Sequence, residues 1–192
     1  MSFLTQQQLA EMGFQSLGKN VLISEKASIY GAPRIRIGHN VRIDDFCILS
    51  AGEQGISLGN YIHIACYTSL IGKAAISLGD FSNLSSRVSI YSSNDDYSGN
   101  YMTNPMVPVD FINVDHRPVR IGRHCIVGSG TVVLPGVTMD EGSAIGALSL
   151  VTQNCVAFGT YAGVPAHYVK ERNRRLLVHE KALLCSKKSQ TT

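Results

Sequence analysis

The sequence predicts an all-β protein folded as a triangular parallel β-helix, and a six-residue period is the main observation behind this prediction. An aliphatic residue returns at every sixth position of the segment 121–157, namely at Ile121, Val127, Val133, Met139, Ile145, Val151 and Ala157. A second, usually small side chain follows four positions later, as at Cys125, Thr131 and Ser143. An α-helix repeats at about 3.6 residues and a lone strand at 2, so neither explains a period of six. A short strand plus a corner, wound three times per coil, does explain it.

The same register recurs upstream in groups of three, which is the second observation. The groups are Leu17, Ile23, Ile29; Ile37, Ile43, Leu49; Leu58, Ile64, Leu70; and Leu78, Leu84, Ile90. Their first members lie 20, 21 and 20 residues apart, slightly more than three hexapeptides require. Internal repetition of this kind predicts a solenoid of about seven coils, on the order of 33 Å long at ~4.8 Å per coil.

One coil carries a long insertion, the third observation. Leu78 and Ile121 occupy equivalent positions but lie 43 residues apart, so this coil contains about 25 extra residues. The excess corresponds to the polar, proline-bearing loop 94–118. A long irregular loop on a regular scaffold is usually functional.

These patterns divide the chain into three parts, the second of which carries the inserted loop. Residues 1–16 are expected to form a helix that caps the open first coil, because an uncovered solenoid end exposes apolar core and an unpaired strand edge. The β-helix is expected over 17–167, with the inserted loop 94–118. Residues 168–192 are expected to form a C-terminal amphipathic helix and tail, with the last residues, 186–192, disordered.

Composition excludes several classes of protein. The net charge is only +3 and 16% of residues are charged, with much of the positive charge in the tail, so a nucleic-acid partner is not expected. No run of 18 apolar residues and no charged-then-apolar leader is present, so neither membrane insertion nor export is expected, and the predicted location is cytoplasmic. Five cysteines without CxxC spacing are expected to be reduced thiols, four of them in or beside inward positions (Cys47, Cys66, Cys125 and Cys155).

The repeat, the mid-chain insertion and the closing AGVPAHYVKER motif of residues 162–172 resemble the hexapeptide-repeat acyltransferases, and in particular the sugar O- and N-acetyltransferases typified by galactoside and maltose acetyltransferase. The resemblance covers residues 17–172. It implies that the β-helix is left-handed, that the chain forms a homotrimer, and that acetyl-CoA is the co-substrate and lies in a groove between neighbouring coils.

The resemblance also places the cofactor contacts on the C-terminal coils. The matching positions are Ser129, Ala147, Thr152, Gln153, His167 and Lys170. Small side chains at Ser129 and Ala147 let a pantetheine arm approach the strand backbone, although both could also be ordinary corner residues. Lys170, together with Arg172 or Arg174, suits phosphate groups. The family commonly has Lys at position 153 and Arg at position 167, so Gln153 and His167 weaken the phosphate contacts there.

The acceptor end departs from the family pattern. In these acetyltransferases a histidine at the start of the insertion removes the acceptor proton, but that position falls on or near Asn94 here. The candidate catalytic residues are therefore His116, where the loop returns, and Asp95 and Asp96, where it leaves; closure of the loop is expected to bring His116 beside the aspartates. Asn94 and Tyr97 are the candidate substrate-binding residues. A structural explanation remains open for each: a corner hydrogen bond for His116 and loop capping for the aspartates.

This departure bears on the acceptor. A sugar hydroxyl is too weak an acid to react unaided at neutral pH, whereas a sugar amine is partly free base there. Loss of the family histidine therefore lowers reactivity towards an amine less than reactivity towards a hydroxyl. Both O- and N-acetylation of a sugar or nucleotide sugar stay open, and either suits surface-polysaccharide biosynthesis.

Two other functions compete with acetyl transfer. A zinc β-helical carbonic anhydrase needs three imidazoles from adjacent coils, but His116 and His124 have no third partner at a matching position, so no metal site is expected. A non-catalytic scaffold would need neither the long loop nor the closing motif.

Overall fold

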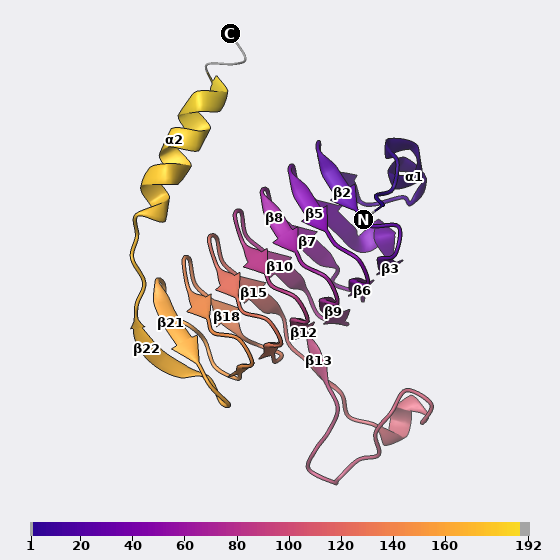
Figure 1. The fold of residues 1–192 in the computed structure, drawn as a ribbon. Coiled ribbons are helices and arrows are strands. Elements are labelled where there is room, and N and C mark those ends of the chain that lie inside the picture. The colour runs from indigo at the N-terminus through magenta and orange to yellow at the C-terminus, as the bar shows by residue number, and fades with distance from the viewer. Residues whose placement is uncertain (1, 189–192) are drawn as a thin grey trace.

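The computed structural model describes residues 2–188. Most of them form a three-sided prism of stacked coils (Figure 1). The first sheet has the order β1 (Ser16–Leu17), β4 (Ile35–Ile37), β7 (Ile56–Leu58), β10 (Ile76–Leu78), β15 (Val119–Ile121) and β18 (Thr138–Met139). The second has β2 (Val21–Ile23), β5 (Val41–Ile43), β8 (Ile62–Ile64), β11 (Asn83–Leu84), β16 (Ile126–Val127), β19 (Ala144–Ile145), β21 (Gly159–Ala162) and β22 (His167–Glu171). The third has β3 (Ser28–Tyr30), β6 (Ile48–Ala51), β9 (Ser69–Gly72), β12 (Ser89–Tyr91), β17 (Val132–Val133) and β20 (Leu150–Val151). We call the corners between them the 1–2, 2–3 and 3–1 edges.

The hexapeptide register defines the core. Equivalent residues of neighbouring coils are partners in parallel ladders, for example Leu58 with Leu78 and Leu78 with Ile121. Their side chains point into the prism, and Ile64, Leu70 and Ile90 are fully buried. Burial of aliphatic side chains at every rung is the main source of stability.

The register ends earlier than the sequence predicted. Ala157, expected to point inward, is exposed, and Phe158 is buried instead. Phe158 adopts a left-handed backbone conformation (φ 56°) at the corner, so its ring rather than the Ala157 methyl covers the last coil. The ring lies where a Cβ on Gly142 would clash with it, in contact with the coil below.

Both ends of the stack are covered. Helix α1 (Gln6–Glu11) begins with a capping box between Thr5 and Gln8, and its Leu9 is fully buried. At the other end, β22 pairs antiparallel with β21. The prediction of a helix from residue 168 was therefore wrong for 168–175. Residues 168–171 lie in β22, because the last strand of the stack leaves an edge that a following strand satisfies, and the helix begins only at Leu176.

Helix α2 (Leu176–Lys188) follows β22 and runs beside the prism (Figure 1). Its Glu180 hydrogen-bonds His124 Nε2 at 3.0 Å and pairs with Arg123 on the 1–2 edge. Of the terminal residues expected to be disordered, 186–188 belong to this helix and 189–192 lie outside the described residues.

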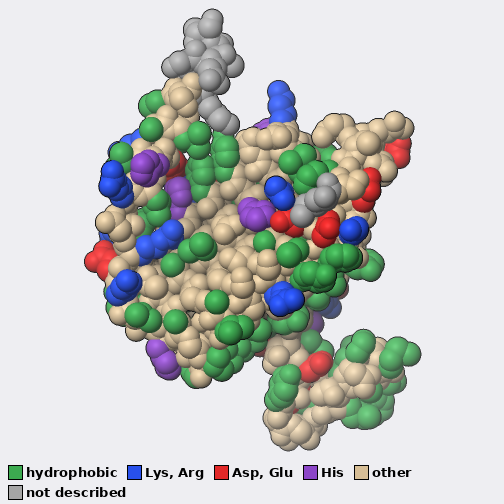
Figure 2. Space-filling view, in the orientation of Figure 1, with side chains coloured by type: hydrophobic (Ala, Val, Ile, Leu, Met, Phe, Trp, Pro, Cys, Tyr) green, Lys and Arg blue, Asp and Glu red, His purple; other side chains and the backbone are tan. Residues whose placement is uncertain are grey.

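The insertion leaves the prism at the 3–1 edge and projects from it (Figure 1). Its base is a two-stranded ladder of β13 (Ser93–Asn94) and β14 (Asp115–His116), and its tip holds the short 3₁₀ helix η2 (Val109–Phe111). A second 3₁₀ turn, η1 (Ala32–Arg34), lies at an earlier 3–1 corner. Apolar and polar side chains lie side by side on the loop surface (Figure 2), with Tyr97, Met106 and Val109 each more than three-quarters exposed.

None of the helices within residues 2–188 combines the length and apolar character needed to cross a membrane.

The ladder of buried aliphatic residues makes a stability prediction. Leu70→Ala removes a fully buried side chain and is expected to lower the free energy of unfolding by about 2–5 kcal/mol, because the rigid coils cannot collapse into the cavity. Chemical denaturation monitored by circular dichroism measures it. Ser69→Ala, on the outward face of the same strand, is the control and should change the midpoint little; equal effects of the two variants would contradict the assignment of the core.

Candidate functional site

The base of the loop positions His116. The β13–β14 ladder sets His116 opposite Ser93 and Asp115 opposite Asn94. Ser93 Oγ lies 2.8 Å from His116 Nδ1, and Arg117 Nε donates to Asp115 Oδ2 at 2.6 Å. His116 is exposed, so its Nε2 faces solvent or an incoming group.

The two aspartates differ in their surroundings. Asp96 accepts hydrogen bonds from the Ser98 N–H at 2.6 Å and from Asn113 Nδ2 at 3.3 Å. These bonds, that from Ser98 above all, hold the pKa of Asp96 below its usual value, so Asp96 is a carboxylate at neutral pH. Asp95 is exposed, and its carbonyl accepts a bond from Asn94 Nδ2.

Asp95 and its neighbours line a hollow between the loop and the third sheet. The lining residues are Tyr91, Ser93, Asn94, Asp95, Tyr97, Val132 and Leu134. The hollow therefore brings together the candidate substrate-binding residues Asn94 and Tyr97 with one candidate catalytic aspartate. Its aliphatic wall is formed by Val132, at an outward position of β17, and by Leu134, the residue after that strand. Apolar residues are unexpected at outward positions, so this pattern in the sequence could have pointed to the hollow.

The expected pairing of His116 with the aspartates is absent. Among the described residues no hydrogen bond or ion pair joins His116 to Asp95 or Asp96, and Ser93 is its partner instead. The register of the short β13–β14 ladder decides this pairing, and sequence reasoning had no means of finding Ser93.

The predicted cofactor residues occupy three places. Ser129 and Ala147 are exposed on successive coils of the 2–3 edge, joined by the bond from Leu148 N–H to the Ser129 carbonyl at 2.8 Å. Thr152 and Gln153 lie on the 3–1 edge after β20. His167 and Lys170 lie on β22, opposite Ala162 and Thr160. Ser129 and Ala147 are the pair that neighbouring coils bring together, whereas Thr152 and Gln153 are simply consecutive in the chain.

The two arginines expected to assist Lys170 are already engaged. Arg172 Nη1 donates to the carbonyls of His124 at 2.8 Å and Gly142 at 3.0 Å, which ties the segment after β22 to the 1–2 edge. Arg174 lies over the Phe158 ring, 4.7 Å from its centroid, and donates to Glu171. One nitrogen of the Arg172 guanidinium therefore holds the chain end in place, and its expected contact with phosphate stays a prediction.

Two of the cofactor candidates, Ser129 and Ala147, lie on the opposite margin of the third sheet from the acceptor candidates. Asn94, Asp95 and His116 belong to the 3–1 edge, whereas Ser129 and Ala147 belong to the 2–3 edge. A face of about five residues separates the two edges by roughly 16 Å at ~3.3 Å per residue.

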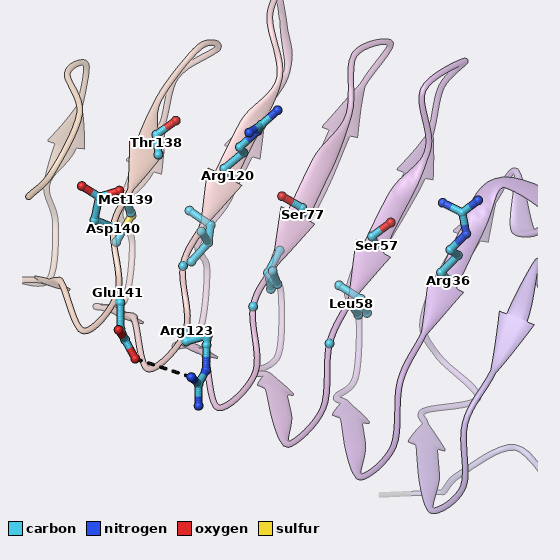
Figure 3. A pocket seen from close by; sticks show the side chains of 15 residues that line it. Arg36, Ser57, Leu58, Ser77, Arg120, Arg123, Thr138, Met139, Asp140 and Glu141 are labelled. Atoms are coloured by element: carbon cyan, nitrogen blue, oxygen red, sulfur yellow. Dashed lines mark ion pairs between the residues drawn. The ribbon is translucent and has the colours of Figure 1, made fainter. Parts of the chain in front are cut away.

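The first sheet carries another hollow that contains none of these candidates (Figure 3). Its outward residues Arg36, Ser57, Ser77 and Arg120 follow one another in register up the sheet. The serines and a column of glycines at the 1–2 edge leave it shallow, and its Glu141 faces Arg123 at 3.8 Å.

The buried cysteines are poor nucleophiles. Burial raises the pKa of Cys47 to about 11 and that of Cys155 to about 12, and it raises the pKa of Cys125 as well. At neutral pH these thiols are protonated and packed in the core. A covalent acyl-cysteine intermediate on any of the three is therefore disfavoured.

A prism of hexapeptide coils, with a long loop beside a hollow on the third sheet, is typical of the β-helical transferases of the hexapeptide class. No protein-family model matches the chain. It is 56% identical over 177 residues, 92% of each chain, to the dTDP-4-amino-4,6-dideoxy-D-glucose acyltransferase of Escherichia coli. It is 29% identical over 135 residues to the putative lipopolysaccharide biosynthesis O-acetyl transferase WbbJ of E. coli K12, covering 68% of this chain and 64% of that one.

A solved structure agrees over nearly the whole chain. AntD, an N-acyltransferase from Bacillus cereus crystallised with dTDP and coenzyme A, superposes with a TM-score of 0.92 at 44% identity, covering 97% of this chain and 100% of AntD. The chain therefore belongs to the family of CoA-dependent sugar acyltransferases with a left-handed β-helix. The predicted fold class and enzyme class are confirmed, and the scaffold and carbonic anhydrase alternatives are set aside.

The burial of the thiols predicts their reactivity. At pH 8 a thiol of pKa about 11 is about one part in a thousand thiolate, so Cys47, Cys125 and Cys155 should resist iodoacetamide while exposed Cys185 reacts. Peptide mass spectrometry after timed alkylation measures this, with Cys185→Ser as the control that removes the fast-reacting site. Because Cys66 is only partly buried, the turnover assay uses a variant that lacks both Cys66 and Cys185, and loss of turnover after its alkylation would contradict transfer without a buried cysteine.

Proposed function

We propose that this enzyme transfers an acetyl group from acetyl-CoA to the 4-amino group of a dTDP-linked 4-amino-4,6-dideoxyhexose, for surface-polysaccharide biosynthesis in the cytoplasm. The observation that carries the proposal is the 56% identity, end to end, with an acyltransferase named for this nucleotide sugar. A variant of AntD has been solved with dTDP-4-amino-4,6-dideoxyglucose and coenzyme A together. The donor acyl group is the least constrained part, since AntD has also been solved with 3-hydroxybutyryl-CoA.

The chemistry of the acceptor end favours an amine. The neutral amine attacks the thioester carbonyl, a C–N bond forms, and the C–S bond breaks from a tetrahedral intermediate. The nitrogen loses one proton and the CoA sulfur leaves as a thiolate, which is then protonated. This sequence needs an acceptor for only one proton from an already nucleophilic nitrogen, and the family histidine is replaced by Asn94.

The proposed roles follow from the placement of the side chains. His116, held by Ser93, receives the proton that the nitrogen releases. Asp96, a carboxylate at neutral pH, and Asp95 orient the amine, with Asn94 and Tyr97 on the walls of the hollow. Ser129, Ala147, Thr152, Gln153, His167 and Lys170 are proposed to contact CoA.

The AntD variants support a role for an aspartate in this loop. The altered residues of AntD are a serine and an aspartate ten positions apart in that chain. The same spacing joins Ser85 to Asp95 and Ser86 to Asp96 here. In both pairs the serine lies on the 2–3 edge and the aspartate on the loop at the 3–1 edge, again on opposite margins of the third sheet.

This separation supports a homotrimer. Within one chain, roughly 16 Å of sheet lies between the loop and the edge that carries Ser129 and Ala147. Three copies around an axis parallel to the prism would set the loop of one copy against the 2–3 edge of the next and complete three equivalent sites. The exposed apolar side chains of the loop, Met106 and Val109 among them, would be covered by that contact.

Turnover of the amine tests the reaction. Purified enzyme with acetyl-CoA and dTDP-4-amino-4,6-dideoxyglucose should release CoA and give a product heavier by one acetyl group, by mass spectrometry. His116→Ala is expected to lower kcat at least about tenfold, because the proton acceptor is lost, while CoA binding is unchanged.

Two comparisons sharpen this test. His116→Gln keeps a hydrogen bond to Ser93 but takes no proton, so recovery of kcat in that variant would make His116 a positioning residue. An unchanged kcat in His116→Ala would remove it from the mechanism. Absence of any turnover of the amine by the wild-type enzyme would overturn the proposed function.

Mixing variants tests the shared site. The Asp95→Ala, Asp96→Ala double variant spoils the loop, and Ala147→Trp blocks the 2–3 edge, so each alone should be nearly inactive. Co-expressed in equal amounts, they should recover about a quarter of wild-type activity, because one in four interfaces then pairs an intact loop with an intact edge. If one chain supplied the whole site, the mixture would stay inactive.

A further inference from the structure

A ladder of cations and aromatic rings is exposed on the 2–3 edge. Phe46 and Tyr67 stack with centroids 5.0 Å apart at 18°, Lys26 lies 5.3 Å from the Phe46 centroid, and Arg87 lies 5.9 Å from that of Tyr67. Phe46 is 46% exposed and Tyr67 53%. Stacked aromatic rings with this much free surface are unusual on a monomer and often mark a binding site.

The backbone beneath the ladder is in an unfavourable conformation for these side chains. Phe46, Tyr67 and Arg87 have φ values of 61°, 62° and 61°, in the left-handed region that bulky residues rarely occupy. At the equivalent corner of the 1–2 edge, the early coils use Asn20 and Asn40, which tolerate it. Tyr61, Phe81 and His124 of the 1–2 edge adopt the same conformation, with φ values of 57°, 61° and 56°, so it belongs to the corner position and not to ligand binding as such.

The 1–2 edge shows what the same corner position does when it serves packing. Tyr61, Phe81 and His124 stack there with centroid spacings of 4.8 Å, and His124 is 9% exposed beneath Glu180 of α2. That stack is closed by a carboxylate from the same chain. On the 2–3 edge Arg87 has no carboxylate partner among the described residues, and its guanidinium is free to bind an anion.

The ladder lies on the same edge as Ser129 and Ala147, two of the proposed CoA contacts. Going up the edge, Tyr67 and Arg87 are followed on the next two coils by Ser129 and Ala147. The Gly130 N–H donates to the Ser86 carbonyl at 3.0 Å, so the edge is continuous across the coil from which the loop is inserted. A donor bound along Ser129 and Ala147 leaves only the N-terminal part of this edge for an acceptor that reacts with it end to end.

We propose that Phe46, Tyr67 and Arg87 bind the thymidine diphosphate part of the acceptor, a role that rests on the proposed function. The faces of the Phe46 and Tyr67 rings are taken by each other, by Lys26 and by Arg87, so the base packs against the exposed ring edges, in the edge-to-face arrangement that aromatic groups favour. The Arg87 guanidinium binds the diphosphate. An extended nucleoside diphosphate sugar spans roughly three coils at ~4.8 Å each, which brings the sugar amine from Phe46 to the step between Ser86 and Ser129.

Binding of thymidine diphosphate to the full-length enzyme by calorimetry tests the assignment. Tyr67→Asn removes the ring while keeping a residue that tolerates the left-handed backbone, and Arg87→Gln removes the charge. Each should weaken dTDP binding, and raise KM for the nucleotide sugar, at least tenfold, with kcat and the Kd for CoA within about twofold of wild type. Tyr61→Asn makes the same change at the equivalent corner of the 1–2 edge and should leave dTDP binding unchanged.

The outcomes separate the two proposals. If wild-type enzyme turns over the nucleotide sugar and both variants bind dTDP within twofold of it, this assignment is wrong and the proposed function stands. If Tyr67→Asn weakens CoA instead, the rings hold the adenine of the donor and the assignment is again wrong. A wild-type enzyme that neither binds dTDP nor acetylates the nucleotide sugar overturns both proposals.

Discussion

The structure depends on the stacking of each inward side chain on its equivalent one coil away. Ile56, Ile76 and Val119 share one such column, and Leu58, Leu78 and Ile121 share the next. Because the ladders are parallel and in register, each outward and corner residue is also carried onto its equivalent in the next coil. The surface is therefore organised in columns, and a ligand along an edge meets one residue per coil at ~4.8 Å spacing.

The sequence predicted the parts of the fold that this stacking governs. The six-residue period located the inward positions from Ile37 to Val151, and the break in that period located the loop, because burial is a property that each coil repeats. The prediction failed where repetition stops. Ala157 and residues 168–171 belong to the end of the stack, where the need to cover the last coil and pair its final strand outweighs both the period and helix propensity.

The site was predictable in composition and not in geometry. Asn94, Asp95 and Tyr97 could be identified because the loop concentrates polar and titratable residues at one place, and they do line one hollow. The partner of His116 could not be identified, because cross-strand pairing in the β13–β14 ladder, with only two residues in each strand, is fixed by a register that no pattern encodes. The carbonyl acceptors of Arg172 could not be identified for a related reason: they are remote in sequence and meet it only in the folded chain.

The 1–2 and 2–3 edges, which both carry stacked aromatic rings, show how one repeating scaffold can separate stability from the binding proposed above. At both edges a corner residue with left-handed backbone stacks on its neighbour, so the scaffold offers the same platform twice. On the 1–2 edge α2 closes the platform through Glu180, and the stacked rings contribute to the packing of the chain end. On the 2–3 edge no segment within residues 2–188 covers Phe46 and Tyr67, and the loop that could cover them projects from the other margin of the third sheet. In the homotrimer proposed above, the loop of a second copy would lie against this edge, so assembly and the completion of the site would be one event.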